Sequence, residues 1–275
     1  LKTLLPYQDK LMAAIKAYDG GRLEESIKLL EEIIAERKDL SQAYSHLATV
    51  YKEQRKLKEA LEILRKGLTN NPSDYKIMEI YGIILTEVGE YDKAVEILKN
   101  ALSYIDYDPE IWNYLGVAYW KKGDFELAHD AFTKILSIDE NYPIAFNNLG
   151  SLYLSQYIKS KNDRNFWNAI LNFKKALELD PNYAEAYNGL GTAYGQAGRI
   201  EAAIHCWERA VELSPDYGFP LYNLGLAYLM QGDKEKALMC LNKYKQEHYG
   251  RLSNKDKAKL DDLIEKVNKI TENHD

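Results

Sequence analysis

The sequence predicts an all-α fold, a solenoid of stacked antiparallel helix pairs, and two observations lead to this prediction. One pattern of large and small residues recurs about every 34 residues along most of the chain. Within each recurrence, apolar residues follow helical spacing on both sides of a turn, usually with glycine, which is typical of two helices joined by a short connection. A single pair cannot bury both of its apolar faces, so successive pairs must stack and share a core.

The pattern is clearest in the segment WNYLGVAYWKKGDFELAHDAF, residues 112–132. Small residues in it are expected where helices approach closely, and large residues are expected to fill the space between neighbouring pairs. The pattern positions are Trp112, Leu115, Gly116, Tyr119, Gly123, Phe125, Ala128 and Phe132. One step upstream the same positions hold Met78, Tyr81, Gly82, Leu85, Gly89, Tyr91, Ala94 and Leu98.

This pattern resembles the tetratricopeptide repeat family, whose signature W-x2-L-G-x2-Y, followed by A and F, is matched from Trp112 to Phe132. The resemblance covers about nine-tenths of the chain, because seven copies follow one another in phase. It implies a right-handed α-solenoid, or superhelix, formed by residues 1–251. The predicted repeats are residues 7–40, 41–74, 75–108, 109–142, 143–183, 184–217 and 218–251.

Two departures from the family pattern are local. The first repeat has Lys10 where a large aromatic residue is usual. Repeats three and four lack the closing proline that other repeats have at Pro72, Pro181 and Pro215. We expect looser packing at those ends.

Residues 252–275 are predicted to form a capping helix and tail. Ser253 is a suitable N-cap, and the apolar residues that follow it are separated by charged residues at helical spacing. An alternative is an amphipathic helix that binds a partner. The apolar residues are Leu260, Leu263, Ile264, Val267 and Ile270.

Repeat five is seven residues longer than the others, and the surplus lies in SQYIKSKNDRNFWNAI. Seven residues are nearly two helical turns, so both helices of the repeat can lengthen by about one turn and stay in phase with their neighbours. The resulting hairpin is a candidate docking site for a partner. The alternative is a tolerated insertion whose aromatic residues pack on the lengthened pair. The residues concerned are Lys159, Lys161, Arg164, Phe166 and Trp167.

Asparagine is a mediocre helix former, yet Asn147 and Asn148 are adjacent in a predicted helix. With Asn113, Asn188 and Asn223 they form two ladders at the fifth and sixth positions of repeats four to seven. In this family those positions face the concave groove, and the resemblance extends to members such as the O-linked N-acetylglucosamine transferases, which hold extended peptide by its backbone. The remaining predicted groove residues are Tyr114, Trp120, Ser151, Thr192, Gln196, Phe219 and Tyr222.

The amides of this ladder can bond to the N–H and C=O groups of an extended peptide. The alternative is that they bond to a neighbouring helix or to water. A narrower hypothesis is the carboxylate clamp of co-chaperones that bind heat-shock protein tails. It is rejected because the residues at the clamp positions of this chain do not match those that the clamp requires. From repeat four onward its five positions hold Asn113, Val117, Asn148, Glu185 and Gly189.

The composition restricts the partners. The formal net charge is -6, and no basic stripe is present, which argues against nucleic acid and anionic membrane. No run approaches the roughly 18 apolar residues of a spanning helix, so direct membrane insertion is not expected. The chain begins at Leu1 rather than methionine, which suggests a segment of a longer polypeptide and leaves its localisation open.

No catalytic, metal or cofactor constellation is recognisable. The five histidines are scattered, and Cys206 and Cys240 occupy equivalent positions of successive repeats, beyond disulfide reach. Both cysteines are predicted to be small buried fillers. We therefore expect a non-enzymatic module that binds a protein or peptide. The alternative is a structural, self-associating or accessory array that packs on a missing domain of the same chain, since the sequence also looks like the arrays that follow bacterial sulfatase-like hydrolase domains.

Overall fold

The structure is a computed structural model that describes residues 5–272, without the side chains at 5, 6, 251 and 270–272. Fifteen α-helices and one short 3-10 helix make up the secondary structure of this part of the chain. The helices group into two compact units, residues 1–140 and residues 141–275. The predicted class, an all-α array of stacked helix pairs, is confirmed, and the helices are consistent with seven pairs and a capping helix.

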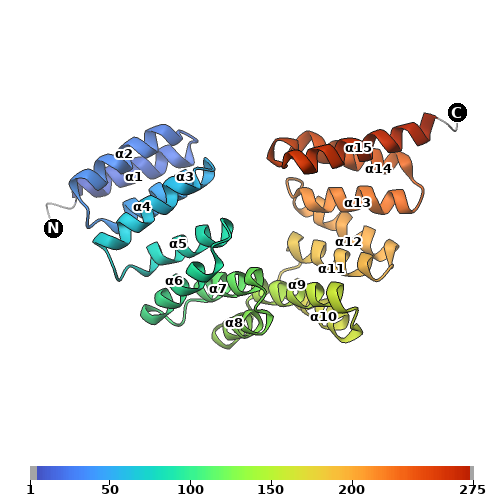
Figure 1. Cartoon of the computed structure of the whole chain (residues 1–275), viewed down its shortest axis with the longest axis horizontal. Coiled ribbons are helices and arrows are strands. Elements are labelled where there is room, and N and C mark those ends of the chain that lie inside the picture. The colour runs from blue at the N-terminus through green and yellow to red at the C-terminus, as the bar shows by residue number, and fades with distance from the viewer. Residues whose placement is uncertain (1–4, 273–275) are drawn as a thin grey trace. The chain divides into compact units, whose positions relative to one another are not determined.

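Unit 1 contains four helix pairs, each formed by two helices that are consecutive in the chain and pack together (Figure 1). The first helix of each pair is called helix A here and the second helix B. The pairs are α1 (Leu5–Asp19) with α2 (Leu23–Glu36), α3 (Ser41–Glu53) with α4 (Leu57–Asn70), α5 (Tyr75–Glu87) with α6 (Tyr91–Tyr104), and α7 (Pro109–Lys122) with α8 (Phe125–Ile138).

Unit 2 contains three pairs and the final helix. Its A helices adjoin one another in the order α9, α11, α13. The elements are α9 (Pro143–Ser160), α10 (Asp163–Leu179), α11 (Ala184–Gln196), α12 (Ile200–Leu213), α13 (Gly218–Met230), α14 (Lys234–His248), η1 (Tyr249–Arg251) and α15 (Asn254–Glu272).

The turn between helices A and B requires a left-handed backbone. Gly123, which ends α7, has φ of 100° and donates its N–H to the carbonyl groups of Tyr119 and Trp120. Glycine adopts this conformation without a steric penalty from a Cβ atom. Repeat two has Arg55 at the equivalent position, with φ of 61°, and its guanidinium forms an ion pair with Glu87 at 2.9 Å.

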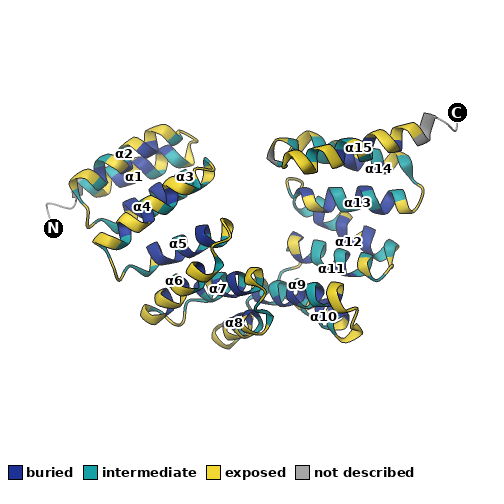
Figure 2. Ribbon diagram, viewed as in Figure 1, coloured by how far each residue is buried: buried dark blue, intermediate teal, exposed yellow. Residues whose placement is uncertain are grey.

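Glycines inside the A helices permit close helix contact. A Cβ atom added to Gly116 would lie 2.5 Å from Cε1 of the fully buried Phe132. Likewise, a Cβ atom added to Gly82 would lie 2.4 Å from Cγ of Leu98 on α6. The predicted roles of the small and large pattern residues are therefore confirmed, and Figure 2 shows the buried positions alternating with exposed ones along the helices.

The lengthening predicted for repeat five is confirmed. Helix α9 has 18 residues and α10 has 17, whereas α7 and α8 have 14 each. Lys161 ends α9 in the left-handed conformation, and the side-chain oxygen of Asn162 accepts the N–H of Arg164 at 2.9 Å to begin α10. The longer hairpin thus has its own helix stop and start signals.

Helix α15 packs against repeat seven. Leu260 and Ile264 are buried against Leu241 of α14, and Val267 is also buried. Leu263 is half-buried in the same cluster, and the side chain of Ile270 lies outside the described residues. The capping role predicted for this helix is confirmed, because its described apolar face covers repeat seven.

Candidate functional site

The predicted groove residues lie in both units, which are described separately. Unit 1 carries Asn113, Tyr114 and Trp120 on α7, and all three side chains are half-buried. In unit 2 the residues lie on the three adjoining A helices, a surface called here the A-helix face. These residues are Asn147, Asn148 and Ser151 on α9, Asn188, Thr192 and Gln196 on α11, and Phe219, Tyr222 and Asn223 on α13.

Two of the ladder asparagines connect α11 to α13. Asn223 donates from Nδ2 to Oδ1 of Asn188 at 3.4 Å, and Asn188 donates from Nδ2 to the hydroxyl of Tyr217 at 3.0 Å. Each amide offers two N–H donors and two acceptor lone pairs, so these contacts use only part of its capacity. Asn188 and Asn223 therefore do bond to a neighbouring element of the fold, as the alternative predicted. Both amides keep further donor and acceptor capacity for a ligand.

The adjacent pair on α9 behaves differently. Asn147 donates from Nδ2 to Oδ1 of Asn148 at 3.4 Å. Oδ1 of Asn147 is buried and accepts no hydrogen bond within the described part of the chain. A buried atom cannot bond to a peptide on the surface, so at Asn147 only the amide nitrogen can contribute to binding.

Sequence reasoning missed three tyrosines beside the ladder. Tyr142, Tyr183 and Tyr217 are the N-cap residues of α9, α11 and α13, and their side chains are half-buried. Burial, followed by the nearby Glu185 carboxylate, raises the pKa of both Tyr183 and Tyr217. The sequence feature that could have pointed to these tyrosines is the dipeptide Asn-Tyr or Asp-Tyr, which ends repeats four, five and six.

Glu79 of unit 1 was also missed, although it lies 34 residues before Asn113 and so holds the same repeat position. It is 7% exposed, and its carboxylate lies 2.9 Å from Nζ of Lys76, which is 3.6 Å from Asp108. Burial raises the pKa of Glu79 despite the opposing effect of Lys76. Burial and the charge of Glu79 in turn raise the pKa of Tyr114.

The hairpin of repeat five combines a buried and an exposed aromatic residue. Phe166 is 4% exposed and packs on Tyr157 with ring centroids 5.4 Å apart, as the packed-insertion alternative predicted. Trp167 is 54% exposed, so the prediction of ordinary packing was wrong for this residue. Its ring lies beneath the guanidinium of Arg199 at 5.4 Å. Neighbouring Lys159, Lys161 and Arg164 are exposed.

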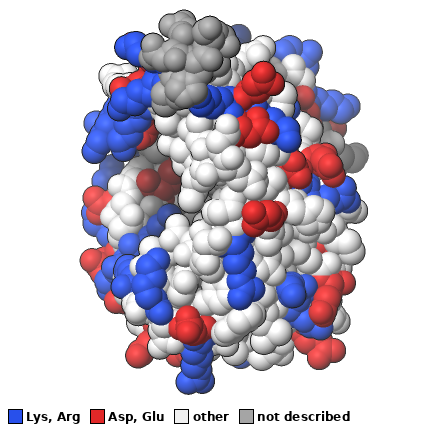
Figure 3. Space-filling model, turned by 90° about the vertical axis from the view of Figure 1, so that its right-hand side faces the viewer, with Lys and Arg blue, Asp and Glu red and all other residues white. Residues whose placement is uncertain are grey.

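Charged side chains of both signs are interspersed on the face shown in Figure 3, with uncharged surface between them. That face has no large area of a single sign, in keeping with the charge pattern of the sequence. Within residues 5–272 no helix has both the length and the apolar character needed to cross a membrane.

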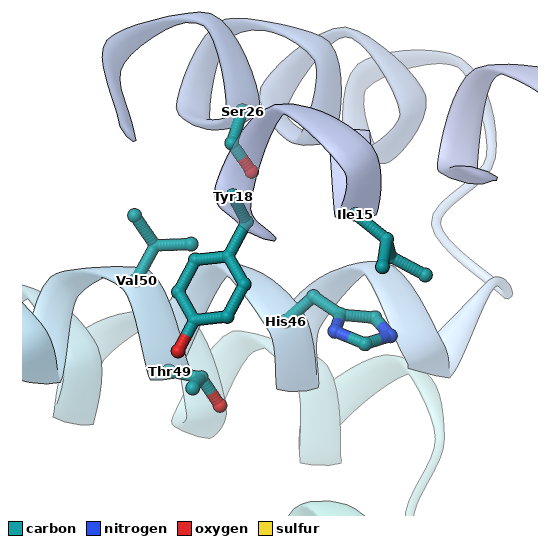
Figure 4. A pocket seen from close by; sticks show the side chains of 6 residues that line it. All are labelled: Ile15, Tyr18, Ser26, His46, Thr49 and Val50. Atoms are coloured by element: carbon teal, nitrogen blue, oxygen red, sulfur yellow. The ribbon is translucent and has the colours of Figure 1, made fainter. Parts of the chain in front are cut away.

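Two hollows of unit 1 differ greatly in volume. The smaller, lined by side chains of α1, α2 and α3, has a volume of about 10 Å³, which is room for a single water molecule (Figure 4). Ser26 contributes a buried hydroxyl with no hydrogen-bond partner in the described structure, and burial lowers the pKa of His46. This hollow is too small for a ligand.

The larger hollow is an open groove of about 600 Å³ along α6, α7 and α8. Apolar Leu102, Trp112 and Leu127 line it together with the basic side chains of Lys99 and Lys134. The indole N–H of Trp112 donates to the carbonyl oxygen of Asp106 at 2.7 Å, which fixes the ring in place.

The cysteines are buried, as predicted. Both Cys206 and Cys240 are free thiols at 5% exposure. Burial raises the pKa of Cys206 to about 11 and raises that of Cys240. Both shifts disfavour the nucleophilic thiolate. The described residues contain no group of three or more His, Cys, Asp or Glu side chains that could hold a metal ion.

Comparison with protein families gives matches along much of the chain. Residues 109–142 and 182–245 match families described as tetratricopeptide repeat, and residues 165–198 match one described as TPR repeat. Residues 19–101 match the family of anaphase-promoting complex, cyclosome, subunit 3. Comparison with curated protein sequences found no significant match.

Solved structures with the same fold include three that are informative. A tetratricopeptide repeat protein from Parabacteroides merdae is 20% identical, with 95% of this chain and 98% of that chain covered and a TM-score of 0.75. The APC/C hetero-tetramer Cut9–Hcn1 is 18% identical over 92% of this chain and 48% of that chain, with a TM-score of 0.68. A thermophilic TPR protein of Thermus thermophilus is 20% identical over 70% of this chain and 98% of that chain, with a TM-score of 0.60.

Proposed function

Because the chain is a tetratricopeptide repeat protein, we propose that it binds an extended segment of a partner protein on the A-helix face of unit 2. Proteins of this family mediate protein–protein interactions and are typically non-catalytic scaffolds. The similar structure that contains Cut9 is a complex with another protein, Hcn1. Both points support a protein rather than a small molecule as the partner.

The observation that carries the proposal is the row of amides on adjoining helices. Asn148, Asn188 and Asn223 are half-buried, so they can be reached from solvent while their positions are held by neighbours. The bonds between Asn223, Asn188 and Tyr217 orient two of these amides before any ligand arrives. Pre-orientation lowers the entropic cost of binding.

The rest of the face suits a peptide that is largely uncharged. Ser151, Thr192 and Gln196 add polar groups, although the hydroxyl of Thr192 already donates to the carbonyl oxygen of Asn188 at 2.8 Å. Exposed Phe219 and Met230 offer apolar contacts. At about 0.5–1.5 kcal/mol net for each hydrogen bond, a few amides provide moderate affinity, and side-chain contacts provide selectivity.

A selection from a random peptide library tests this proposal. Wild-type protein should enrich a set of peptides, and the Asn188→Ala/Asn223→Ala variant should bind those peptides about tenfold or more weakly, because two or more backbone contacts are lost. Asn242→Ala is the control, since Asn242 is an exposed amide on helix B α14. The melting temperatures of the variants exclude unfolding as the cause. Equal binding by the double variant would overturn the proposal.

Self-association is a second candidate function, and the hairpin of repeat five favours it. Trp167 and Leu171, four residues apart on α10, are 54% and 66% exposed, and Ile158 near the end of α9 is also exposed. Adjacent exposed apolar residues of this size commonly mark interaction surfaces. Sedimentation equilibrium should then show a mass that rises with concentration and becomes monomeric in Trp167→Glu/Leu171→Glu. A monomeric wild type at all concentrations would contradict self-association.

A further inference from the structure

One end of the A-helix face carries a group of aromatic and acidic side chains, called here the tyrosine–glutamate cluster: Tyr183, Glu185, Tyr217 and Phe219. Tyr183 and Tyr217 precede α11 and α13, and Glu185 and Phe219 are the second residues of those helices. The rings of Tyr217 and Phe219 meet edge to face with centroids 5.9 Å apart. The hydroxyl of Tyr217 accepts a hydrogen bond from Nδ2 of Asn188 at 3.0 Å.

The cluster is accessible and carries a carboxylate without an ion-pair partner in the described part of the chain. Glu185 is exposed and forms no ion pair within the described part of the chain, and Phe219 is 67% exposed. The charged groups that influence the pKa of Tyr183 and Tyr217 are all acidic: Glu185 at both phenols and Asp180 at Tyr183. No Lys or Arg of the described structure acts on either phenol.

Aromatic rings next to an unpaired carboxylate attract a cation in two ways. The faces of the rings interact with the positive charge through their quadrupoles, and the carboxylate interacts with it directly. Elsewhere in this protein some accessible aromatic rings already have a cation of the same chain over them. Examples are Trp167 with Arg199 and Trp120 with Lys121. The tyrosine–glutamate cluster has no such cation within the described residues, so the position is open to one supplied from outside.

We propose that the peptide bound on the A-helix face places a lysine or arginine side chain at the tyrosine–glutamate cluster, where Glu185 pairs with it and the rings of Tyr217 and Phe219 pack against it. This inference rests on the proposed function and specifies the partner peptide, which should carry a basic residue next to a mostly uncharged segment. The amides of Asn188 and Asn223 lie next to the cluster, so backbone and side-chain recognition occur on adjoining residues.

The test compares two selections from one random peptide library, with wild-type protein and with Glu185→Gln. The wild type should enrich peptides with Lys or Arg at one fixed position, and Glu185→Gln should bind them about threefold to thirtyfold more weakly and lose that preference. Glu185→Lys should select Asp or Glu at the same position. Raising the salt concentration should weaken the binding of wild type more than that of Glu185→Gln.

Glu201→Gln is the matched control. Glu201 is also an exposed carboxylate at the second position of a helix, α12, but it lies on a B helix, so this variant should bind like wild type. Enrichment of peptides without a basic residue would overturn this inference and leave the proposed function standing. An absence of any enrichment would overturn both.

Discussion

At the scale of single residues, the volume of one side chain decides how closely two helices approach. Repeat four pairs Gly116 with Phe132, a large residue with no exposed surface. Repeat two pairs Ala48 with the smaller Leu64 at the same two positions, and both are fully buried. Repeat two thus combines the additional methyl group of alanine with a partner that is smaller than phenylalanine.

Gly116→Ala should lower the free energy of unfolding by about 1–3 kcal/mol, because the new methyl group overlaps the ring of Phe132 in a packed core. The better helix propensity of alanine offsets up to about 1 kcal/mol of this. Urea denaturation measures the change. The double variant Gly116→Ala/Phe132→Leu, which copies the pair in repeat two, should recover part of the loss. An additive second loss would contradict the steric explanation.

Glu79 makes stability depend on pH. Burial raises its pKa in the folded state, so between the unfolded and folded pKa values the native protein binds more protons than the unfolded chain. The free energy of unfolding contributed by this group therefore falls as pH rises through that range. The amide of Glu79→Gln does not titrate, so the stability of this variant relative to wild type should increase as pH rises above about 4, the pKa of glutamate in the unfolded chain.

Chemical denaturation at several pH values checks this expectation for Glu79. Glu126→Gln, at an exposed carboxylate of α8, serves as the control for the loss of a surface charge. A difference between Glu79→Gln and wild type that stays constant with pH would show that the buried carboxyl group does not contribute in this way.

At the scale of helices, the lengthened pair α9 and α10 shows how seven extra residues are accommodated. Neither helix is interrupted, and the added turns are joined by Lys161 and Asn162 at the tip. Buried Tyr157 and Phe166 form a local core between the two extensions. The hairpin therefore has packing of its own rather than being a loose loop.

Two adjacent aromatic residues test this packing. Phe166→Ala should cost about 3–5 kcal/mol, because it removes a buried ring and leaves a cavity. Trp167→Ala should cost less than about 1 kcal/mol, because it removes a half-exposed ring and one cation–π contact with Arg199. Denaturant unfolding of the two variants measures both values. Equal losses would mean that the two rings contribute equally to the core.

At the scale of the whole chain, the helix pairs within each unit pack mainly on the pairs next to them in sequence. Stability in such an array is approximately a sum of terms for single repeats and for the contacts between neighbours. The effect of a core substitution should therefore remain near the repeat that contains it.

Leu47→Ala tests this locality. Leu47 is fully buried in a cluster with Leu11, Leu30 and Ile33, so the substitution should cost about 2–5 kcal/mol. Hydrogen exchange should become faster in α1–α4 and stay unchanged in α11–α14. Uniformly faster exchange along the whole chain would instead indicate a single cooperative unit.

The sequence predicted the helix pairs, the longer repeat five and the capping helix. Each of these follows from a periodic pattern of residues that pack against neighbours close in sequence. It predicted less about the candidate site. Whether the amide of Asn188 faces Tyr217 depends on the path of the connection before α13, which helical periodicity does not describe. The repeat template also omitted the residues before each A helix, so Tyr183 and Tyr217 were missed. The exposure of Trp167 likewise depends on where Arg199 lies in space.

The two buried thiols have a practical consequence. Cys206 on α12 and Cys240 on α14 are the only cysteines of the chain, and both have raised pKa values. A thiol reacts with an alkylating reagent as an exposed thiolate, so labelling of either one requires its helix to open first. The rate of labelling in the unmodified protein therefore measures the local opening of repeats six and seven, without any introduced probe.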